Sequence, residues 1–170
     1  SLGMQIPMWL QRLGAHLLPV VYVADRAEEI SHAVSSSSAD FVITTGGTAA
    51  SAKDHFKTAI EQGNGEVLAS SVEVRPGHPM KLAIMRNPSG RAVPVVGLPG
   101  NPLAAIVALL TFVSPLVAKM LGQDIAALTP VATSAVLKGA KSGTRLIPGS
   151  VSNGIFASAE FSGSAMLRGL

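Results

Sequence analysis

Residues 41–62 read FVITTGGTAASAKDHFKTAIEQ, in which a continuous apolar run leads into a pair of glycines and then into a helix-compatible segment. The run Phe41–Thr45 is short, apolar and rich in β-branched residues, as is typical of a strand buried within a parallel sheet. Gly46 and Gly47 end this strand, and the residues from Lys53 onward favour a helix. The unit therefore predicts an α/β fold, in which strands and helices alternate.

The flanking sequence continues this alternation. We expect helices over residues 1–13 and 27–34, and strands over residues 17–23, 67–74, 80–85 and 92–96, the last two joined as a hairpin by Asn87-Pro88-Ser89-Gly90. A long helix should begin at Pro102, bend near Pro115 and end at Gly122.

A change in composition marks a second part of the chain. From Thr129 onward Pro, Gly, Ser and Thr become frequent, and short strand-like pieces occupy residues 131–137 and 155–159. We therefore predict an α/β domain over residues 1–123 and part of a small β domain over residues 124–170. Because Ser1-Leu2-Gly3-Met4 is not an ordinary start, we expect the chain to be a fragment of a longer protein.

The bulk composition narrows the possible functions. Hydrophobic residues make up 48% of the chain and aromatic residues only 4%, which predicts a core of small aliphatic side chains. The net charge is +3, but the 13 basic residues form no dense run, so we expect no nucleic-acid partner. The absence of cysteine excludes disulfides and thiolate metal sites and fits a cytoplasmic protein.

One stretch lacks charged residues, as a membrane-spanning helix does. No charged residue lies between Arg91 and Lys119. The turn over residues 97–102 interrupts it, however, and the remainder to Ala118 is shorter than the roughly 20 residues that a spanning helix needs. We therefore expect a buried helix and no membrane contact.

Several candidate site residues follow predicted strands. Gly46-Gly47-Thr48 lies between a strand and a helix, where an open α/β sheet binds ligands and where backbone amides can approach a phosphate. Asp54 begins the next helix, and Asp25 follows another apolar run. Either carboxylate could serve a helix N-terminus. Asp54 could instead bind a divalent metal beside phosphate groups.

Two proline- and glycine-rich loops complete the candidate site. Arg75-Pro76-Gly77-His78-Pro79 holds a permanent cation on a stiff loop, which suits an oxyanion such as molybdate or phosphate but also occurs in ordinary surface turns. Gly97-Leu98-Pro99-Gly100-Asn101-Pro102 joins a strand to a helix, with Asn101 placed to cap the helix or present amides to an anion. The alternative is a stiff corner without a ligand.

Taken together, these motifs resemble those of one family. Thr45-Gly46-Gly47, Asp54 with Lys57, the Arg75–Pro79 loop and Leu98–Pro102 occur in the order and spacing of the MoeA and gephyrin E-domain family. The similarity extends to Arg12-Leu13-Gly14-Ala15 and Asp25, and more weakly to Arg145 and residues 161–164. The family's first strand, with its Thr-Gly-Asp-Glu motif, is not found in this sequence.

The resemblance implies a fold, an activity and a site. It implies a MogA-like three-layer α/β domain with a mostly parallel sheet, which in a homodimer inserts molybdate into adenylylated molybdopterin with Mg²⁺ and releases AMP. By this resemblance Asp54, Asp25 and Arg75 are the catalytic residues, and Asp54 is also the metal ligand. The implied cofactor-binding residues are Gly46, Gly47, Thr48, His78, Pro99, Gly100, Asn101 and Pro102.

Two other functions stay open. The string Thr44–Thr48 with Asp54 also resembles MogA and MoaB proteins, which adenylylate molybdopterin. A catalytically weak molybdopterin-binding or scaffold paralogue is the second alternative. Ser71 and Ser150 favour it, because the family often has a basic residue at the first position and an arginine at the second.

Overall fold

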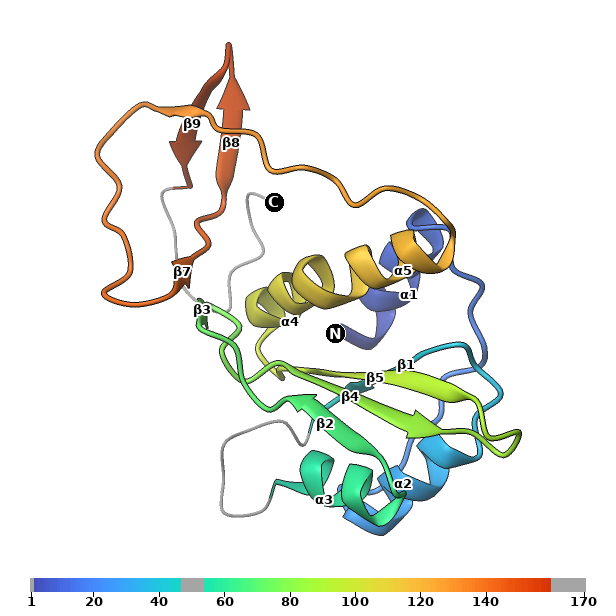
Figure 1. The fold of residues 1–170 in the computed structure, drawn as a ribbon. Coiled ribbons are helices and arrows are strands. Elements are labelled where there is room, and N and C mark those ends of the chain that lie inside the picture. Colours follow the sequence, from blue (N-terminus) through green and yellow to red (C-terminus); the bar gives the residue numbers. More distant parts are fainter. Residues whose placement is uncertain (1, 47–53, 160–170) are drawn as a thin grey trace.

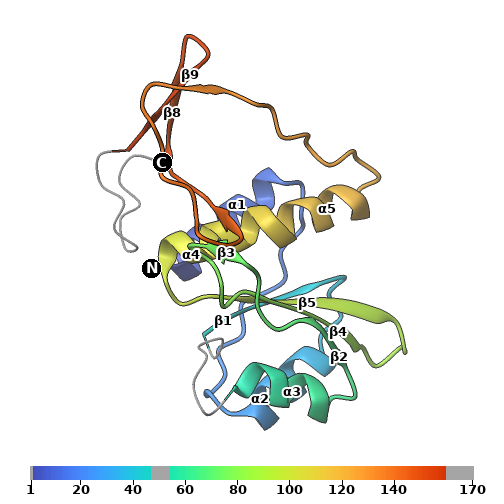
Figure 2. The ribbon, with the colours of Figure 1, turned by 60° about the vertical axis from the view of Figure 1, so that its left-hand side comes forward.

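The computed structural model describes residues 2–46 and 54–159. Figure 1 shows a sheet with helices on both faces, and a smaller β region that a long connection joins to the last helix. The view in Figure 2 has the same layers, with α1, α4 and α5 on one side of the sheet and α2 and α3 on the other. This arrangement confirms the predicted three-layer α/β fold followed by a small β region.

The main sheet has the strand order β1-β5-β4-β2. Its strands are β1 (Val42–Thr45), β5 (Ala92–Leu98), β4 (Lys81–Arg86) and β2 (Glu66–Ala69). β1 and β5 are parallel, and β4 is antiparallel to both β5 and β2. Three of these four strands therefore run in one direction. β4 runs against them because a tight turn over residues 87–90, closed by Asn87 N–H donating to the carbonyl of Arg91, joins it to β5 as the predicted hairpin.

One face of the sheet carries the longer helices. These are α1 (Leu2–Arg12), α4 (Pro102–Ala108), a π-helical turn η1 (Leu109–Val113) and α5 (Ser114–Met120). Where the sequence predicted a bend near Pro115, the helix contains the π turn η1 directly before Ser114, since proline has no N–H to continue the regular hydrogen-bond ladder and a π turn shifts that ladder. Gly122 follows α5 with φ of 70°, as expected for a helix end.

The run Pro102–Met120 is the single helix in the described part of the chain that is long and apolar enough, by length and composition, to cross a membrane. One face of this helix packs on the sheet. Ala105, Ala108 and Val113 are completely buried in a core cluster with Val96 and Leu98 of β5. Packing on the sheet thus accounts for part of the hydropathy of this helix, whereas Leu110 and Met120 are exposed.

The other face of the sheet is covered by α2 (Ala27–Ser35) and α3 (His55–Gln62). Phe56 and Ile60 of α3 pack with Met85 and Val95 of the sheet in a second buried cluster. The alternation of β4 explains this division, since Ala83 and Met85 face α3 whereas Leu82 packs on the opposite cluster. Lys81 therefore lies on the same face as α3.

Two predicted strands differ from those observed. Residues 67–74 do not form one strand, because a bulge follows Val67 in β2 and the chain then leaves the sheet. It forms the short β3 (Val74–Arg75), which pairs in parallel with β7 (Thr144–Arg145). Residues 17–23 form no strand, since in the described residues no chain pairs with them and β1 is the last strand on its side of the sheet. An apolar run alone does not make a strand without a hydrogen-bonded neighbour.

The small β region contains β6 (Ala132–Thr133), β8 (Gly149–Ser152) and β9 (Ile155–Ser158) in the order β6-β9-β8. The strand predicted over residues 131–137 is reduced to β6, and β9 corresponds to the strand expected over residues 155–159. Residues 123–131, where the predicted domain boundary falls, contain no helix or strand. The division into 1–123 and 124–170 stays a prediction.

Candidate functional site

The strand ends predicted to carry the site meet at one edge of the sheet. Thr45 at the end of β1 is level with Leu98 at the end of β5, and Gly97 is level with Lys81 at the start of β4. Gly46 leaves β1 with φ of 92°, a conformation that side chains with a Cβ rarely adopt. Gly47 and Thr48 lie outside the described residues, as do residues 161–164.

The loop after β5 is a capped corner. The Asn101 side chain accepts a hydrogen bond from the backbone N–H of Ala104 at 3.1 Å, and Pro102 follows in the first turn of α4. Pro99 is buried, whereas Gly100 is exposed and a Cβ built on it would meet nothing within 4 Å. Asn101 therefore has the capping role that the sequence predicted, and packing does not require the glycine at position 100.

Asp54 caps the N-terminus of α3 and also forms an ion pair across to the sheet. Its Oδ1 accepts the backbone N–H of Lys57 at 3.1 Å, and its Oδ2 accepts a hydrogen bond from Nζ of Lys81. Burial raises the pKa of Asp54. The hydrogen bonds from Lys81 and from the Lys57 N–H outweigh that effect and leave the pKa below its ordinary value of 3.8. The carboxylate is therefore held as an anion.

Sequence reasoning did not find Lys81. Its side chain is 4% exposed, against 28% for Asp54, and it is the one charged residue that is buried in the described part of the chain. A lysine at a position that alternates with Ala83 and Met85 would point inward, and an inward lysine needs a buried partner. That pattern is the signal from which the pair could have been anticipated.

Asp25 lies apart from this pair, in the loop before α2. It is exposed, and in residues 2–46 and 54–159 it has no hydrogen bond or ion pair. It does not cap the helix, since the cap position is Arg26 and no side chain bonds there. Glu29 closes the loop instead, accepting the N–H of Ala24 at 3.0 Å and pairing with Arg26 at 2.5 Å.

The Arg75–Pro79 loop is fixed by its own contacts. Nδ1 of His78 lies 2.9 Å from the carbonyl oxygen of Val72, and the Val72 N–H donates to the carbonyl of His78 at 3.1 Å. Gly77 has φ of 120°, and a Cβ there would approach Met80 to 2.6 Å and Val107 to 2.9 Å. His78 thus shapes the loop, and Gly77 allows it to pack on α4.

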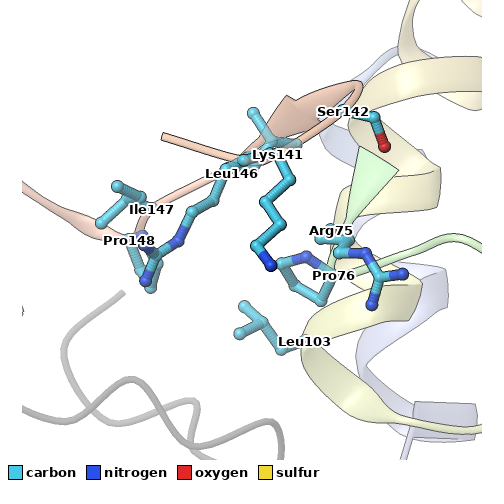
Figure 3. A pocket seen from close by; sticks show the side chains of 10 residues that line it. Arg75, Pro76, Leu103, Lys141, Ser142, Leu146, Ile147 and Pro148 are labelled. Atoms are coloured by element: carbon cyan, nitrogen blue, oxygen red, sulfur yellow. The ribbon is translucent and has the colours of Figure 1, made fainter. Parts of the chain in front are cut away.

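The Arg75–Pro79 loop forms one wall of a cleft of about 530 Å³. Arg75, Pro76 and Leu103 line it from the α/β domain, and residues 140–142 and 145–148 line it from the β region. Figure 3 shows the Lys141 side chain extending toward Pro76 from the opposite wall. Lys141 and Arg145 were not predicted as cleft residues.

The cleft is cationic. Arg75, Lys141 and Arg145 line it, and among residues 2–46 and 54–159 no acidic residue does. Arg75 and Arg145 are direct neighbours in the β3–β7 pairing. The guanidinium of Arg145 also donates to the carbonyl of Lys138 at 2.6 Å, which fixes its position. A cleft lined by three cations, with no carboxylate among its described residues, can bind a polyatomic anion.

The predicted catalytic residues do not gather in one place. Arg75 lines the cleft beside α4, Asp54 lies on the α3 side of the sheet with its partner Lys81, and Asp25 lies in the exposed loop before α2. Gly46, His78, Gly100 and Asn101 do not line the cleft. That all of them contact one ligand stays a prediction.

Comparisons with known proteins agree with this fold. A sequence profile described as "Probable molybdopterin binding domain" matches residues 3–119. The molybdopterin molybdenumtransferase of Haemophilus influenzae is 31% identical over 120 residues, covering 69% of this chain and 28% of that protein. The enzyme of the same name from a Nostoc species is 36% identical over 95 residues, covering 56% of this chain and 21% of that protein.

A solved structure shares the architecture. The molybdopterin biosynthesis MoeA protein from Pyrococcus horikosii superposes with a TM-score of 0.59 at 24% identity, covering 82% of this chain and 34% of that one. The chain thus spans less than a third of the length of the two enzymes it matches in sequence. Since the profile covers more than half of its residues, the chain belongs to the family of molybdopterin-binding domains found in MoeA-like proteins.

Proposed function

We propose that this chain is the molybdopterin-handling part of a molybdopterin molybdenumtransferase, which acts in molybdenum cofactor biosynthesis. The reaction is the insertion of molybdate into adenylylated molybdopterin with release of AMP. The observation that carries the proposal is the cleft lined by Arg75, Lys141 and Arg145, with no carboxylate among its described lining residues. The matches to molybdenumtransferases support the choice of substrate.

The charges of the cleft favour an oxyanion ligand. Arg75 and Arg145 are register partners in the β3–β7 pairing, and Lys141 lines the same cleft. A tetrahedral dianion such as molybdate accepts hydrogen bonds from planar guanidinium groups and offsets positive charge in such a cleft. The Ser142 hydroxyl at the rim can donate one more.

Within this proposal each group has a separate task. Arg75 holds the molybdate and stabilises the charge that shifts during its transfer. The carboxylate of Asp54 and, by resemblance, that of Asp25 are catalytic groups in the reaction of the adenylylated substrate. The turns at Gly46 and Gly100 and the capped end of α4 bind the pterin phosphate, and the loops that contain His78, Pro99 and Pro102 hold these groups in place.

The described residues do not supply a set of ligands for Mg²⁺. They contain no group of three or more His, Cys, Asp or Glu side chains that could hold a metal ion. Both oxygens of Asp54 already accept hydrogen bonds, from Lys57 and from Lys81. The tasks given above to the site residues therefore depend on the side chains of this chain alone.

Transfer assays on the full-length protein test the proposal. Incubation with adenylylated molybdopterin and molybdate should release AMP, and Arg75→Met should reduce the rate at least tenfold, since a hydrogen bond to a charged group contributes about 1.5–3 kcal/mol. Arg75→Lys should retain more activity. Arg86→Met is the matched control, because Arg86 bonds only to Gly90 of the β4–β5 turn in the described residues. Equal AMP release by the Arg75→Met and wild-type proteins would refute the proposal.

The same assay separates the alternatives. Formation of adenylylated molybdopterin from ATP would identify an adenylyltransferase. Pterin binding without either reaction would identify a binding or scaffold paralogue. By resemblance we also infer a homodimer and a cytoplasmic location, which sedimentation of the full-length protein and fractionation of its cells would test.

A further inference from the structure

The ion pair between buried Lys81 and partly exposed Asp54 suggests how this chain balances the charge of the carboxylate. Lys81 is the first residue of β4, and its side chain is only 4% exposed. Removing an ammonium group from water is costly unless a partner compensates for it. Asp54 is that partner, so the ammonium group of Lys81 compensates the negative charge of this carboxylate.

The geometry leaves Asp54 with little capacity for a second cation. Oδ2 accepts from Lys81, and Oδ1 accepts from the N–H of Lys57 at 3.1 Å. The positive end of α3 adds to the stabilisation of the negative charge. A divalent ion at Oδ2 would compete with the ammonium of Lys81, which is buried and has no other counter-ion in the described residues.

Lys81 shares a row of the sheet with a glycine and a threonine. Thr44, Gly97 and Lys81 are level with one another across β1, β5 and β4. The central position has no side chain, and the hydroxyl of Thr44 is buried without a hydrogen-bond partner in the described residues. This row of the sheet is therefore not wholly apolar.

We propose that Lys81 is a positioning residue that takes the place of a divalent cation at Asp54, holding the carboxylate in position with its ammonium group. This inference rests on the proposed function only in naming Asp54 as a carboxylate of the site. It departs from the expectation that Asp54 binds Mg²⁺. The compensating positive charge is instead the ammonium group of Lys81.

The first test uses the unmodified chain. The ¹³C resonance of the Asp54 carboxylate and the ¹⁵N resonance of the Lys81 ammonium are followed by NMR while MgCl₂ is added to about 10 mM at constant ionic strength. We expect neither resonance to shift in a saturable way. A saturable shift of the Asp54 carboxylate would overturn the proposal, because it would mean that the metal competes successfully with Lys81.

The second test removes the ammonium. Lys81→Gln puts an amide oxygen beside the freed carboxylate, and both are ligands that a divalent cation accepts. With Mn²⁺ as the probe, we expect this variant to bind the ion at least tenfold more tightly than the wild type, and the double variant Lys81→Gln/Asp54→Asn to lose the gain. Lys81→Arg, which keeps the charge, should behave as the wild type.

No gain of Mn²⁺ binding by a folded Lys81→Gln protein would also overturn the proposal. If that variant does not fold, Lys81→Met replaces it, since methionine suits the apolar face of β4. Oxyanion binding in the Arg75 cleft is measured in parallel. If the proposed function is wrong, the cleft does not bind the oxyanion and the metal response stays as expected. If the Lys81 proposal is wrong, the metal response differs and oxyanion binding is unaffected. The two failures are therefore distinguishable.

Discussion

Substitution of Gly143 tests whether the β region forms the second wall of the cationic cleft. Gly143 has φ of 69°, and a Cβ there would lie 2.2 Å from the carbonyl oxygen and 2.9 Å from the carbonyl carbon of Glu73. The left-handed conformation costs a residue with a Cβ about 1–2 kcal/mol. The contact with backbone atoms adds to this cost, because neither chain can move without breaking the pairing of β3 with β7.

The size of this cost decides what the variant does. Two hydrogen bonds hold the junction, from Thr144 N–H to Glu73 at 2.8 Å and from Leu146 N–H to Arg75 at 2.9 Å. Their net contribution is about 1–3 kcal/mol in total. Gly143→Ala should therefore release this segment from the Arg75 loop and leave the α/β layers folded, since their cores contain no residue of the segment.

Amide hydrogen exchange is the direct assay. In Gly143→Ala the amides of Thr144 and Leu146 should exchange at the rates of an open chain, and oxyanion binding should weaken at least tenfold although no charge has changed. Gly139→Ala is the matched control, because a Cβ at Gly139 meets nothing within 4 Å. If both amides stayed protected from exchange in Gly143→Ala and this variant bound the oxyanion as the wild type does, the description of the cleft as having a second wall in the β region would be wrong.

Three further predictions concern the α3 side of the sheet. Asp54→Asn keeps a good helix cap but leaves Lys81 buried without a counter-ion, so it should lower the free energy of unfolding by about 3 kcal/mol. Lys81→Met should cost about 1 kcal/mol or less, because Asp54 is partly exposed and can be hydrated; urea denaturation compares the two, and an equal loss would contradict the burial argument. The pKa of Asp54 lies below 3.8, so the pair's contribution should be present above that pH and be lost as the pH falls through the lowered pKa. Acid unfolding curves should show this component in the wild type, and its persistence in Asp54→Asn would refute the assignment. Phe56→Ala should lower the free energy of unfolding by about 3–5 kcal/mol, since Phe56 is 1% exposed in the α3 cluster, and a loss below about 1 kcal/mol in thermal denaturation would contradict this packing.

Signals within a few consecutive residues were sufficient to predict several turns and helix caps of the fold. The glycine after β1, the cap of α4 at Asn101 and the turn at Asn87 each involve residues within a few positions of one another. The carboxyl ends of β1 and β5 were expected at one edge because parallel strands bring them there. These signals predicted the layered fold and the location of Asp54 and Asn101.

The remaining features depend on pairings between distant segments. Lys81 meets Asp54 only because the β4–β5 hairpin places the start of β4 at the edge where α3 begins. Lys141 and Arg145 reach Arg75 only because β3 leaves the main sheet and pairs with β7, some 70 residues later in the chain. No periodicity or turn signal in either segment specifies that pairing. The sequence therefore singled out the Arg75 loop as a candidate oxyanion site, which stays a prediction, but it did not indicate the residues that complete the cleft.

Anomalous diffraction from crystals of this chain grown with tungstate tests the central claim most directly, because tungstate has the shape and charge of molybdate. The account predicts a tungsten peak in the cleft, within hydrogen-bond distance of Arg75 and of Lys141 or Arg145. A peak at the Gly46 turn instead, or no peak in the cleft at saturating tungstate, would contradict it.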